Sequence, residues 1–463
     1  MDVPECPGCR ALLVRNAELE ARILALEGQV RDLIDKAKPP QPPRVITPQP
    51  PAPVKKPTGR KPGGQPGHPP AMKVLVPASR VDKVEKYIPE RCEKCDQPLS
   101  PDASPDDPEP TRFQVAELPK LAAVITEHQG HARTCACCNT VTRSPIPTEV
   151  RAHCVGTRMA ATLSYMAGCH GLSKRALEEI SEAVFDAPIA LGTVANLEQE
   201  MSAALVPAHE EARSAIASAP VKHLDETGWK EAGKKRWLWV AATTTIVYFL
   251  IHPRRNLAAL QRVVGEKLAG ILCSDRWRVY DRWELEQRQL CWAHVKRNWE
   301  KQIERGGAAK RVGEAWLEVQ GRVFALWHVF RGGGCTRKDL DERMAPLAEE
   351  LGEVLWSGRR SGDRALVGFC ERLAERSVAL WTFVSTEGVE PTNNHAERVL
   401  RRAVLWRRRS FGCPSPEGCR FVERVLTAVQ SLRQQKRSVL EFLCATLESH
   451  RQGLPVPKLV SGG

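Results

Sequence analysis

The fold of the largest domain is decided by residues 221–251, VKHLDETGWKEAGKKRWLWVAATTTIVYFLI. Three apolar runs occupy 221–225, 237–242 and 246–251, and a threonine-rich turn joins the last two. Short apolar runs bounded by turn residues are typical of buried strands. The stretch therefore predicts three strands of one sheet.

The chain on either side extends this domain. A helix is expected after Asn256 and another strand at 270–273, and strands followed by helices indicate a mixed α/β sheet. Residues 300–385 and 391–448 have helical patterns, the second rich in arginine. All twelve tryptophans lie beyond residue 220, which favours one large, well-packed domain beginning near 219.

Three carboxylates are placed to act together. Asp225 closes the first apolar strand, Asp275 follows the strand at 270–273, and Glu397 lies in the first turns of the arginine-rich helix. Carboxylates at adjacent strand ends repel one another unless a divalent cation neutralises them. Oxygen ligands of this kind suit Mg²⁺ or Mn²⁺, and two such ions assist phosphodiester displacement. Spacing alone does not single these three out from 55 acidic residues.

Paired cysteines predict a zinc module at 71–150. Cys-x-x-Cys presents two thiolates from one tight turn, and zinc takes four such ligands. The preferred ligands are Cys92, Cys95, Cys135 and Cys138. Cys137 is a possible substitute, and His128 or His131 could complete a variant site. Cys6 and Cys9 form a third pair, either metal-free or sharing an ion across a dimer.

The N-terminal segment is expected to form a leucine-zipper-like coiled coil. Leu12, Leu19, Leu26 and Leu33 recur every seven residues, with Asn16 at a companion position. One polar residue there favours a two-stranded parallel coil. A homodimer or higher oligomer is thus expected, the alternative being a helix packed on its own chain. Residues 38–70 are proline-rich and basic, either a tether or a DNA-contacting arm.

Overall charge favours a nucleic-acid partner. The formal net charge is +13, and a chain this basic suits a polyanion. Residues 151–218 have the rhythm of a helix-turn-helix, although other helical hairpins look alike. No run is long and apolar enough for a membrane span, and no signal peptide is evident. We therefore expect a cytoplasmic protein associated with the nucleoid.

The motifs together resemble the large transposase of the insertion sequence 66 family over essentially the whole chain. They occur in that family's order. They are the N-terminal coil, GRKPGGQPGH at 59–68, the cysteine pairs, DET at 225–227, WLWV at 237–240, SD at 274–275, CWAHVKR at 291–297 and NNHAER at 393–398.

This resemblance implies a ribonuclease H-like catalytic core with a helical insertion, and it implies Asp225, Asp275 and Glu397 as the Asp-Asp-Glu triad. It also implies double-stranded DNA partners, namely terminal inverted repeats and target, and small accessory proteins. The expected domains are 1–37 coiled coil, 38–70 linker, 71–150 zinc module, 151–218 helical DNA-binding segment, 219–299 first part of the core, 300–385 helical insertion, 386–450 end of the core and 451–463 tail.

Basic residues beside the triad are candidates for phosphate contact. They are Lys296, Arg297, Arg398, Arg401 and Arg402, with Arg407, Arg408 and Arg409 further along the same helix. The alternative is a solvated helix face, and for Trp292 and His294 it is core packing. The expected function is DNA cleavage and strand transfer. The alternatives are a silent DNA-binding regulator and a nuclease without strand transfer.

Overall fold

The computed structural model describes residues 22, 75–102 and 104–460. The expected coiled coil at 1–37, apart from Arg22, the linker at 38–70, and Cys6 with Cys9 lie outside the described residues. The chain divides into two units, residues 1–116 and 117–463, which are considered separately. The first contains the short helix η1 (Ala78–Arg80) and a turn at 92–97 closed by an Arg91–Pro98 bridge.

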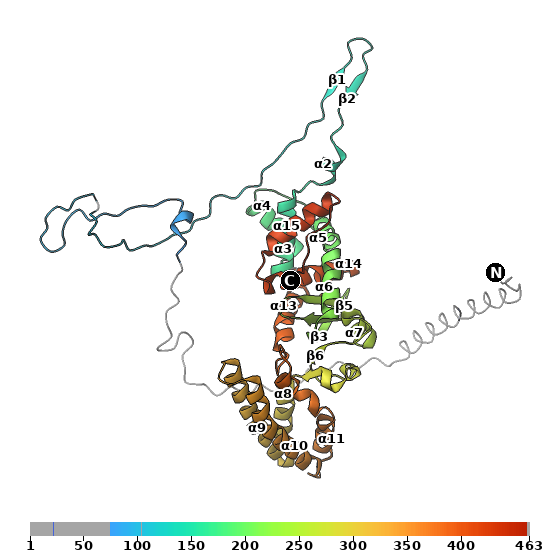
Figure 1. Ribbon diagram of the computed structural model, residues 1–463. Helices are drawn as coiled ribbons and strands as arrows, with labels where there is room; N and C mark the ends of the chain where they lie inside the picture. The colour runs from blue at the N-terminus through green and yellow to red at the C-terminus, as the bar shows by residue number, and fades with distance from the viewer. Residues whose placement is uncertain (1–21, 23–74, 103, 461–463) are drawn as a thin grey trace, which may run out of the picture. The chain divides into compact units, whose positions relative to one another are not determined.

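A mixed five-stranded sheet in the second unit positions the candidate site (Figure 1). Its strand order is β5-β4-β3-β6-β7. The strands are β3 (Val221–Glu231), β4 (Lys234–Ala242), β5 (Val247–His252), β6 (Ile271–Ser274) and β7 (Arg288–Leu290). β3, β4 and β5 pair antiparallel, whereas β6 pairs parallel with β3 and with β7. The expected strands and mixed sheet are confirmed, and β7 is the strand that was expected before His294, Lys296 and Arg297.

The β3–β4 hairpin shows why the first strand is longer than its apolar run. Ala232 and Gly233 both have positive φ, 47° and 77°, which the tightest two-residue hairpin turns require. β4 therefore folds straight back and pairs with β3 as far as Glu231. The expectation that the strand ends at Asp225 is wrong, because β4 supplies hydrogen-bond partners beyond the point where β6 stops.

Helices cover both faces of the sheet. Along β4, Trp239 and Ala241 join one buried cluster, and Leu238 and Val240 join the other, as strand alternation requires. The first cluster includes α3 (Thr157–His170), α4 (Lys174–Ala183), α5 (Leu191–Ala204), α6 (Val206–Ser218), α7 (Leu257–Val264) and α15 (Val439–Arg451). The second includes α13 (Asn394–Ser410), and α14 (Pro416–Gln434) contributes to both. The helical expectations for 151–218 and 391–448 are confirmed.

Helix α14 also closes the open edge of the sheet. Its Glu423, Thr427 and Ser431 accept hydrogen bonds from the main-chain N–H groups of alternate β5 residues Ile251, Phe249 and Val247. Four helical residues rise about 6 Å, close to the roughly 6.6 Å that two strand residues span. The helix therefore supplies hydrogen-bond acceptors to main-chain N–H groups of the edge strand β5. Without them, these groups could pair with another strand.

The helical pattern expected at 300–385 is confirmed, and this helical segment has its own core. It contains α8 (Trp292–Ile303), α9 (Gly307–Arg331), α10 (Arg337–Arg359), α11 (Arg364–Ala374), η4 (Ser377–Leu380) and α12 (Thr382–Ser385). Figure 1 shows α9, α10 and α11 grouped beyond the sheet. Trp292, Trp299, Trp316 and Trp327 are buried among these helices. Trp292 is therefore a core residue.

Short elements complete the described chain. They are β1 (Ala132–Thr134), β2 (Val141–Arg143), α2 (Thr148–Ala152), η2 (Arg278–Arg282) and η3 (Leu285–Gln287). The extended run at 122–126 belongs to no strand of the described chain. None of the helices described is long and apolar enough to cross a bilayer.

Candidate active site

Strand register brings the two aspartates to the same place. β3 and β6 pair Val221 with Ile271 through His223 with Cys273. The same register, continued two positions, sets Asp225 beside Asp275. Asp275 follows β6 directly, and its carboxylate Oδ1 accepts the Trp277 main-chain N–H at 2.9 Å. The register agrees with the expectation that the two carboxylates lie on neighbouring strands, although Asp225 lies within β3 and only Asp275 follows a strand end.

Electrostatic interactions link the three carboxylates. Burial raises the pKa of Asp225 to about 7. The charges of Glu226, Asp275 and Glu397 add to the rise, and the Glu226 main-chain N–H, 2.9 Å from Asp225 Oδ1, opposes it. The charges of Asp275 and Glu397 thus both act on Asp225, although these three carboxylates are not among the groups of the described chain whose ligand atoms all lie within 4.8 Å of one another. A divalent cation would relieve their repulsion, and these hard oxygen donors fit Mg²⁺ or Mn²⁺.

Asn393 joins the helix that carries Glu397 to the strand that carries Asp225. Its side chain Nδ2 donates to the main-chain oxygen of Leu224 at 2.6 Å, and its Oδ1 lies 3.0 Å from His223 Nδ1. Because an amide oxygen only accepts, His223 Nδ1 carries the proton. Asn393 occupies the N-cap position of α13 without a capping side-chain bond. Its side chain does not cap the helix, because its amide is already committed to β3.

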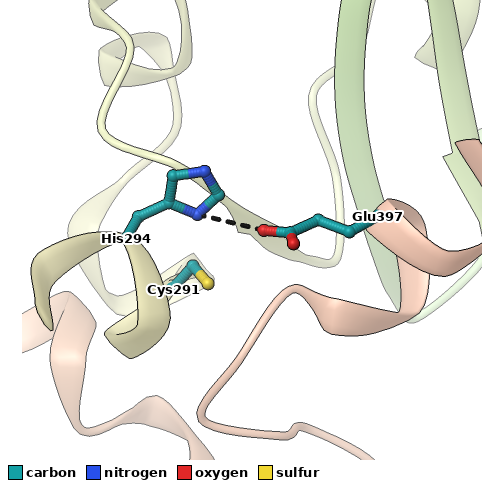
Figure 2. Close-up of side chains that lie close together, drawn as sticks. All are labelled: Cys291, His294 and Glu397. Atoms are coloured by element: carbon teal, nitrogen blue, oxygen red, sulfur yellow. Dashed lines mark ion pairs between the residues drawn. The ribbon is translucent and has the colours of Figure 1, made fainter. Parts of the chain in front are cut away.

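His294 of α8 and Cys291, the N-cap of α8, lie beside Glu397 (Figure 2), and Arg297 of α8 also contacts it. Glu397 Oε1 lies 3.0 Å from Arg297 Nη2 and 3.4 Å from His294 Nδ1. Cys291, the N-cap of α8, completes a group whose ligand atoms all lie within 4.8 Å of one another. Burial, followed by the charge of Arg297, lowers the pKa of His294, so the His294–Glu397 contact at neutral pH is not a charged pair. Burial also raises the pKa of the Cys291 thiol.

Glu226 supports the site from the other side of β3. It accepts hydrogen bonds from Arg255 Nε at 2.7 Å and from the Tyr280 hydroxyl at 2.5 Å, and its side chain is 2% exposed. The Arg255 guanidinium lies 3.9 Å from the Trp277 ring centroid. Glu226 therefore anchors the segment that follows Asp275. Sequence reasoning missed this role, and the adjacent acidic pair at 225–226 was its only signal.

Comparison with protein families assigns the chain. The family described as "Transposase IS66 family" matches residues 153–420. The chain belongs to the IS66 family of transposases. The matched span includes Asp225, Asp275 and Glu397, and the resemblance expected from the motifs is confirmed. The search of curated proteins finds no match.

The basic residues expected to contact DNA in this IS66-family transposase differ in their surroundings. Lys296, Arg398, Arg401 and Arg402 are exposed, and no ion pair involves the last three within the described residues. Arg297 is half-exposed and engages Glu397. By contrast, Arg407 donates to Thr227 Oγ1 at 3.0 Å and to the Gly228 oxygen, and Arg409 donates to the His170 oxygen at 3.0 Å. In this structure those two arginines therefore make contacts that join α13 to the rest of the protein.

The two cysteine pairs of the transposase adopt matching turns, one in each unit. Cys92 N–H donates to Gln97 O, and Asp96 N–H donates to Cys92 O, both at 2.9 Å. Cys135 N–H to Thr140 O and Asn139 N–H to Cys135 O repeat this pattern at 2.9 Å. Asp96 and Asn139 share a φ of 53°.

Hydrogen bonds at both turns favour the thiolate form that metals bind. Those from the main chain of Lys94 lower the pKa of Cys92, and those from the Thr140 hydroxyl lower the pKa of Cys138.

Proposed function

We propose that this transposase cuts DNA at the ends of its element and joins them to a target by metal-dependent phosphoryl transfer. The observation that carries the proposal is the parallel register of β3 and β6, which, continued two positions, sets Asp225 beside Asp275. The charges of Asp275 and Glu397 add to the raised pKa of Asp225, which supports it. The mixed sheet followed by a helical insertion supports a ribonuclease H-like core.

Asp225, Asp275 and Glu397 are the proposed ligands for Mg²⁺ or Mn²⁺. When bound, such ions lower the pKa of the attacking oxygen and stabilise the leaving oxygen. In the first reaction a water oxygen bonds to phosphorus, the bond to the bridging 3′ oxygen breaks, and a 3′-hydroxyl is left at the element's end. That hydroxyl then attacks a phosphodiester of the target and displaces its 3′ oxygen. The carboxylates hold the reacting groups in line, and positioning supplies most of the rate enhancement.

Double-stranded DNA approaches along α8 and α13 in this proposal. Lys296, Arg297, Arg398, Arg401 and Arg402 contact its phosphates, and salt-dependent affinity follows. Arg297 exchanges Glu397 for a phosphate when DNA arrives, since its side chain is 52% exposed. The helical segment at 151–218 reads the terminal repeats, the N-terminal coiled coil dimerises the protein, and small accessory proteins assist. The protein acts in the cytoplasm on the nucleoid.

Zinc is the proposed ion of Cys92, Cys95, Cys135 and Cys138. The matching turns support this because each presents two thiols from one bend. No described residue from 75 to 154 is buried, so this segment has little apolar burial to stabilise it. Metal ligation commonly replaces a core in small modules of this kind.

The test is a Mg²⁺-dependent cleavage and strand-transfer assay on DNA carrying the element's own ends. Asp225→Asn, Asp275→Asn and Glu397→Gln should each abolish cleavage while end binding persists, and Glu314→Gln on α9 is the exposed-carboxylate control. Binding without cleavage in the unaltered protein, with accessory proteins supplied, would identify a DNA-binding regulator. Cleavage without a joined product would identify a nuclease.

A further inference from the structure

Cys291, His294 and Glu397 form a second constellation of donors beside the aspartates. β6 and β7 pair Ser274 with Leu290, so the next positions in register are Asp275 and Cys291. His294 is one helical turn beyond Cys291 and extends from the first turn of α8. Glu397 reaches the same point from the first turn of α13 (Figure 2). One sulfur, one nitrogen and one oxygen donor thus converge within 4.8 Å.

The His294 Nδ1 atom faces Glu397. It is buried, lies 3.4 Å from Glu397 Oε1 and makes no hydrogen bond among the described residues. The Cys291 sulfur accepts the Asn393 main-chain N–H at 3.1 Å. A buried nitrogen without a partner costs free energy that a bound cation would recover.

The chemistry of the donors excludes magnesium as the preferred occupant. Magnesium prefers oxygen ligands in octahedral geometry, whereas zinc and cobalt accept thiolate, imidazole and carboxylate together. Three protein ligands leave the fourth tetrahedral position open. Small shifts of the side chains would bring the donors within zinc bonding distances of about 2.0–2.3 Å.

We propose that Cys291, His294 and Glu397 bind one zinc-class ion, and that this binding withdraws Glu397 from the magnesium site. The second part rests on the proposed function, because it assumes that Glu397 completes that site. On ligation the Cys291 thiol releases one proton and binds as thiolate, while His294 binds as the neutral ring. Arg297 leaves Glu397 and turns into solvent. Zinc occupancy therefore disables the proposed catalytic centre reversibly.

Metal content tests the first part directly in the full-length protein. Wild type, Cys291→Ala and Cys273→Ala are loaded with Co²⁺, and bound metal and thiolate absorption are measured. Cys273 is the matched control, because it is a buried thiol on the neighbouring strand with neither His294 nor Glu397 beside it. We expect Cys291→Ala to bind one equivalent less than wild type, and Cys273→Ala to match wild type. Equal metal content in all three proteins would overturn the site.

His294→Gln provides an independent variant if Cys291→Ala fails to fold. The substitution removes the nitrogen ligand and alters a half-exposed side chain. The variant should bind one equivalent of Co²⁺ less than wild type. Retention of that equivalent by a folded His294→Gln protein would overturn the assignment of His294.

Competition with Mn²⁺ tests the second part without relying on activity. Electron paramagnetic resonance reports free Mn²⁺, and zinc should release bound Mn²⁺ from wild type but not from Cys291→Ala. If Co²⁺ binds and Mn²⁺ does not, the proposed function fails and the zinc-class site stands. If Mn²⁺ binds and zinc leaves it bound, the withdrawal of Glu397 is refuted.

Discussion

Asn393 Nδ2 donates a hydrogen bond to the main-chain oxygen of Leu224 across 2.6 Å, although the two residues are 169 positions apart in the chain. Asn393 is 1% exposed and immediately precedes the helix of Glu397, while Leu224 immediately precedes Asp225. This bond therefore attaches the start of the helix that carries Glu397 to the strand that carries Asp225. Its loss should affect stability and metal binding together.

Asn393→Ala is expected to lower the free energy of unfolding by about 1–3 kcal/mol, because it leaves buried partners on His223 and Leu224 without hydrogen bonds. It should also weaken Mn²⁺ binding, since α13 loses its attachment beside Asp225. Urea unfolding and Mn²⁺ titration measure the two effects. Asn394→Ala, at the exposed neighbouring position, is the control and should change both very little. A destabilised Asn393→Ala protein with unchanged Mn²⁺ affinity would show that α13 is held by other contacts.

Burial of Glu423 predicts a pH-dependent stability. Burial raises the pKa of its carboxyl to about 7, against the counteracting charge of Arg420. Between pH 4.5 and 7 the folded protein then binds a proton that the unfolded chain has released. The free energy of unfolding must therefore fall as pH rises through this window.

Glu423→Gln removes this titration and keeps an acceptor for the Ile251 N–H. From pH 4.5 to 8, wild type should lose about 1–3 kcal/mol more than this variant. Chemical denaturation at several pH values measures the difference. Glu448→Gln, on the exposed face of α15, is the control and should follow wild type. Parallel curves for wild type and Glu423→Gln would mean that Glu423 ionises normally in the folded protein.

Gly270 sits where β6 begins, and a side chain there should displace the strand that ends beside Asp275. Its φ is +72°, and an added Cβ would lie 2.6 Å from the Ala219 oxygen and 2.8 Å from the Pro220 oxygen. Gly233 has a similar φ of +77° with nothing within 4 Å. Gly233→Ala should cost only the conformational penalty, roughly 1–2 kcal/mol. Gly270→Ala should lower the free energy of unfolding by clearly more than Gly233→Ala. Equal decreases in melting temperature for the two variants would show that the backbone at Ala219 moves to accommodate the added Cβ.

The strands that could be predicted are those whose own residues have a strand pattern. β4 and β5 are apolar runs of the right length, and Asn256 caps α7 through its side chain, as its position before an apolar helix indicates. The bounds of β7 were not predictable, because Arg-Gln-Leu has no strand pattern of its own. Its Arg288 is buried only because Asp281 pairs with it at 2.8 Å, and Gln289 because the η4 and α12 segment supplies its partners. Such burial depends on residues far along the chain.

The candidate site also contains some residues that the sequence indicated and others that depend on tertiary packing. The apolar runs at Asp225 and before Asp275 predicted that these two positions meet on neighbouring strands, but spacing alone did not single them out among the acidic residues. Glu397 required the family resemblance, because a helix position gives no sign of which strand it faces. The grouping of Cys291 and His294 with Glu397 arises from the packing of α8 against α13, which no local pattern specifies.

If zinc binds at the matching turns, its removal should destabilise the segment between residues 75 and 154. Cys138→Ser should reduce zinc content and increase proteolysis between residues 75 and 154, where no described residue is buried. Cys137→Ser is a close control, since Cys137 is exposed and lies next to Cys138 in the same turn. Elemental analysis and limited proteolysis provide the readouts. If Cys137→Ser loses zinc and Cys138→Ser keeps it, the ligand assignment must be exchanged between them.

Exposed arginines on α13 should control the salt dependence of DNA binding. Arg398, Arg401 and Arg402 are exposed and lack ion pairs within the part of the chain described, so each is available to a phosphate. Changing all three to alanine should weaken binding to any duplex and reduce the slope of log affinity against log salt by about 3, since each phosphate contact contributes about 0.9.

The charge-matched control removes Lys338, Arg343 and Arg359, which are exposed on α10. It lowers the net charge by the same amount but lies on the helical insertion, away from α13. Fluorescence anisotropy over a salt series separates the two variants. An unchanged slope for the α13 variant would mean that these arginines do not contact phosphates. An equal loss of affinity in both variants would mean that net charge governs binding. Either result would refute the proposed path of DNA along α13.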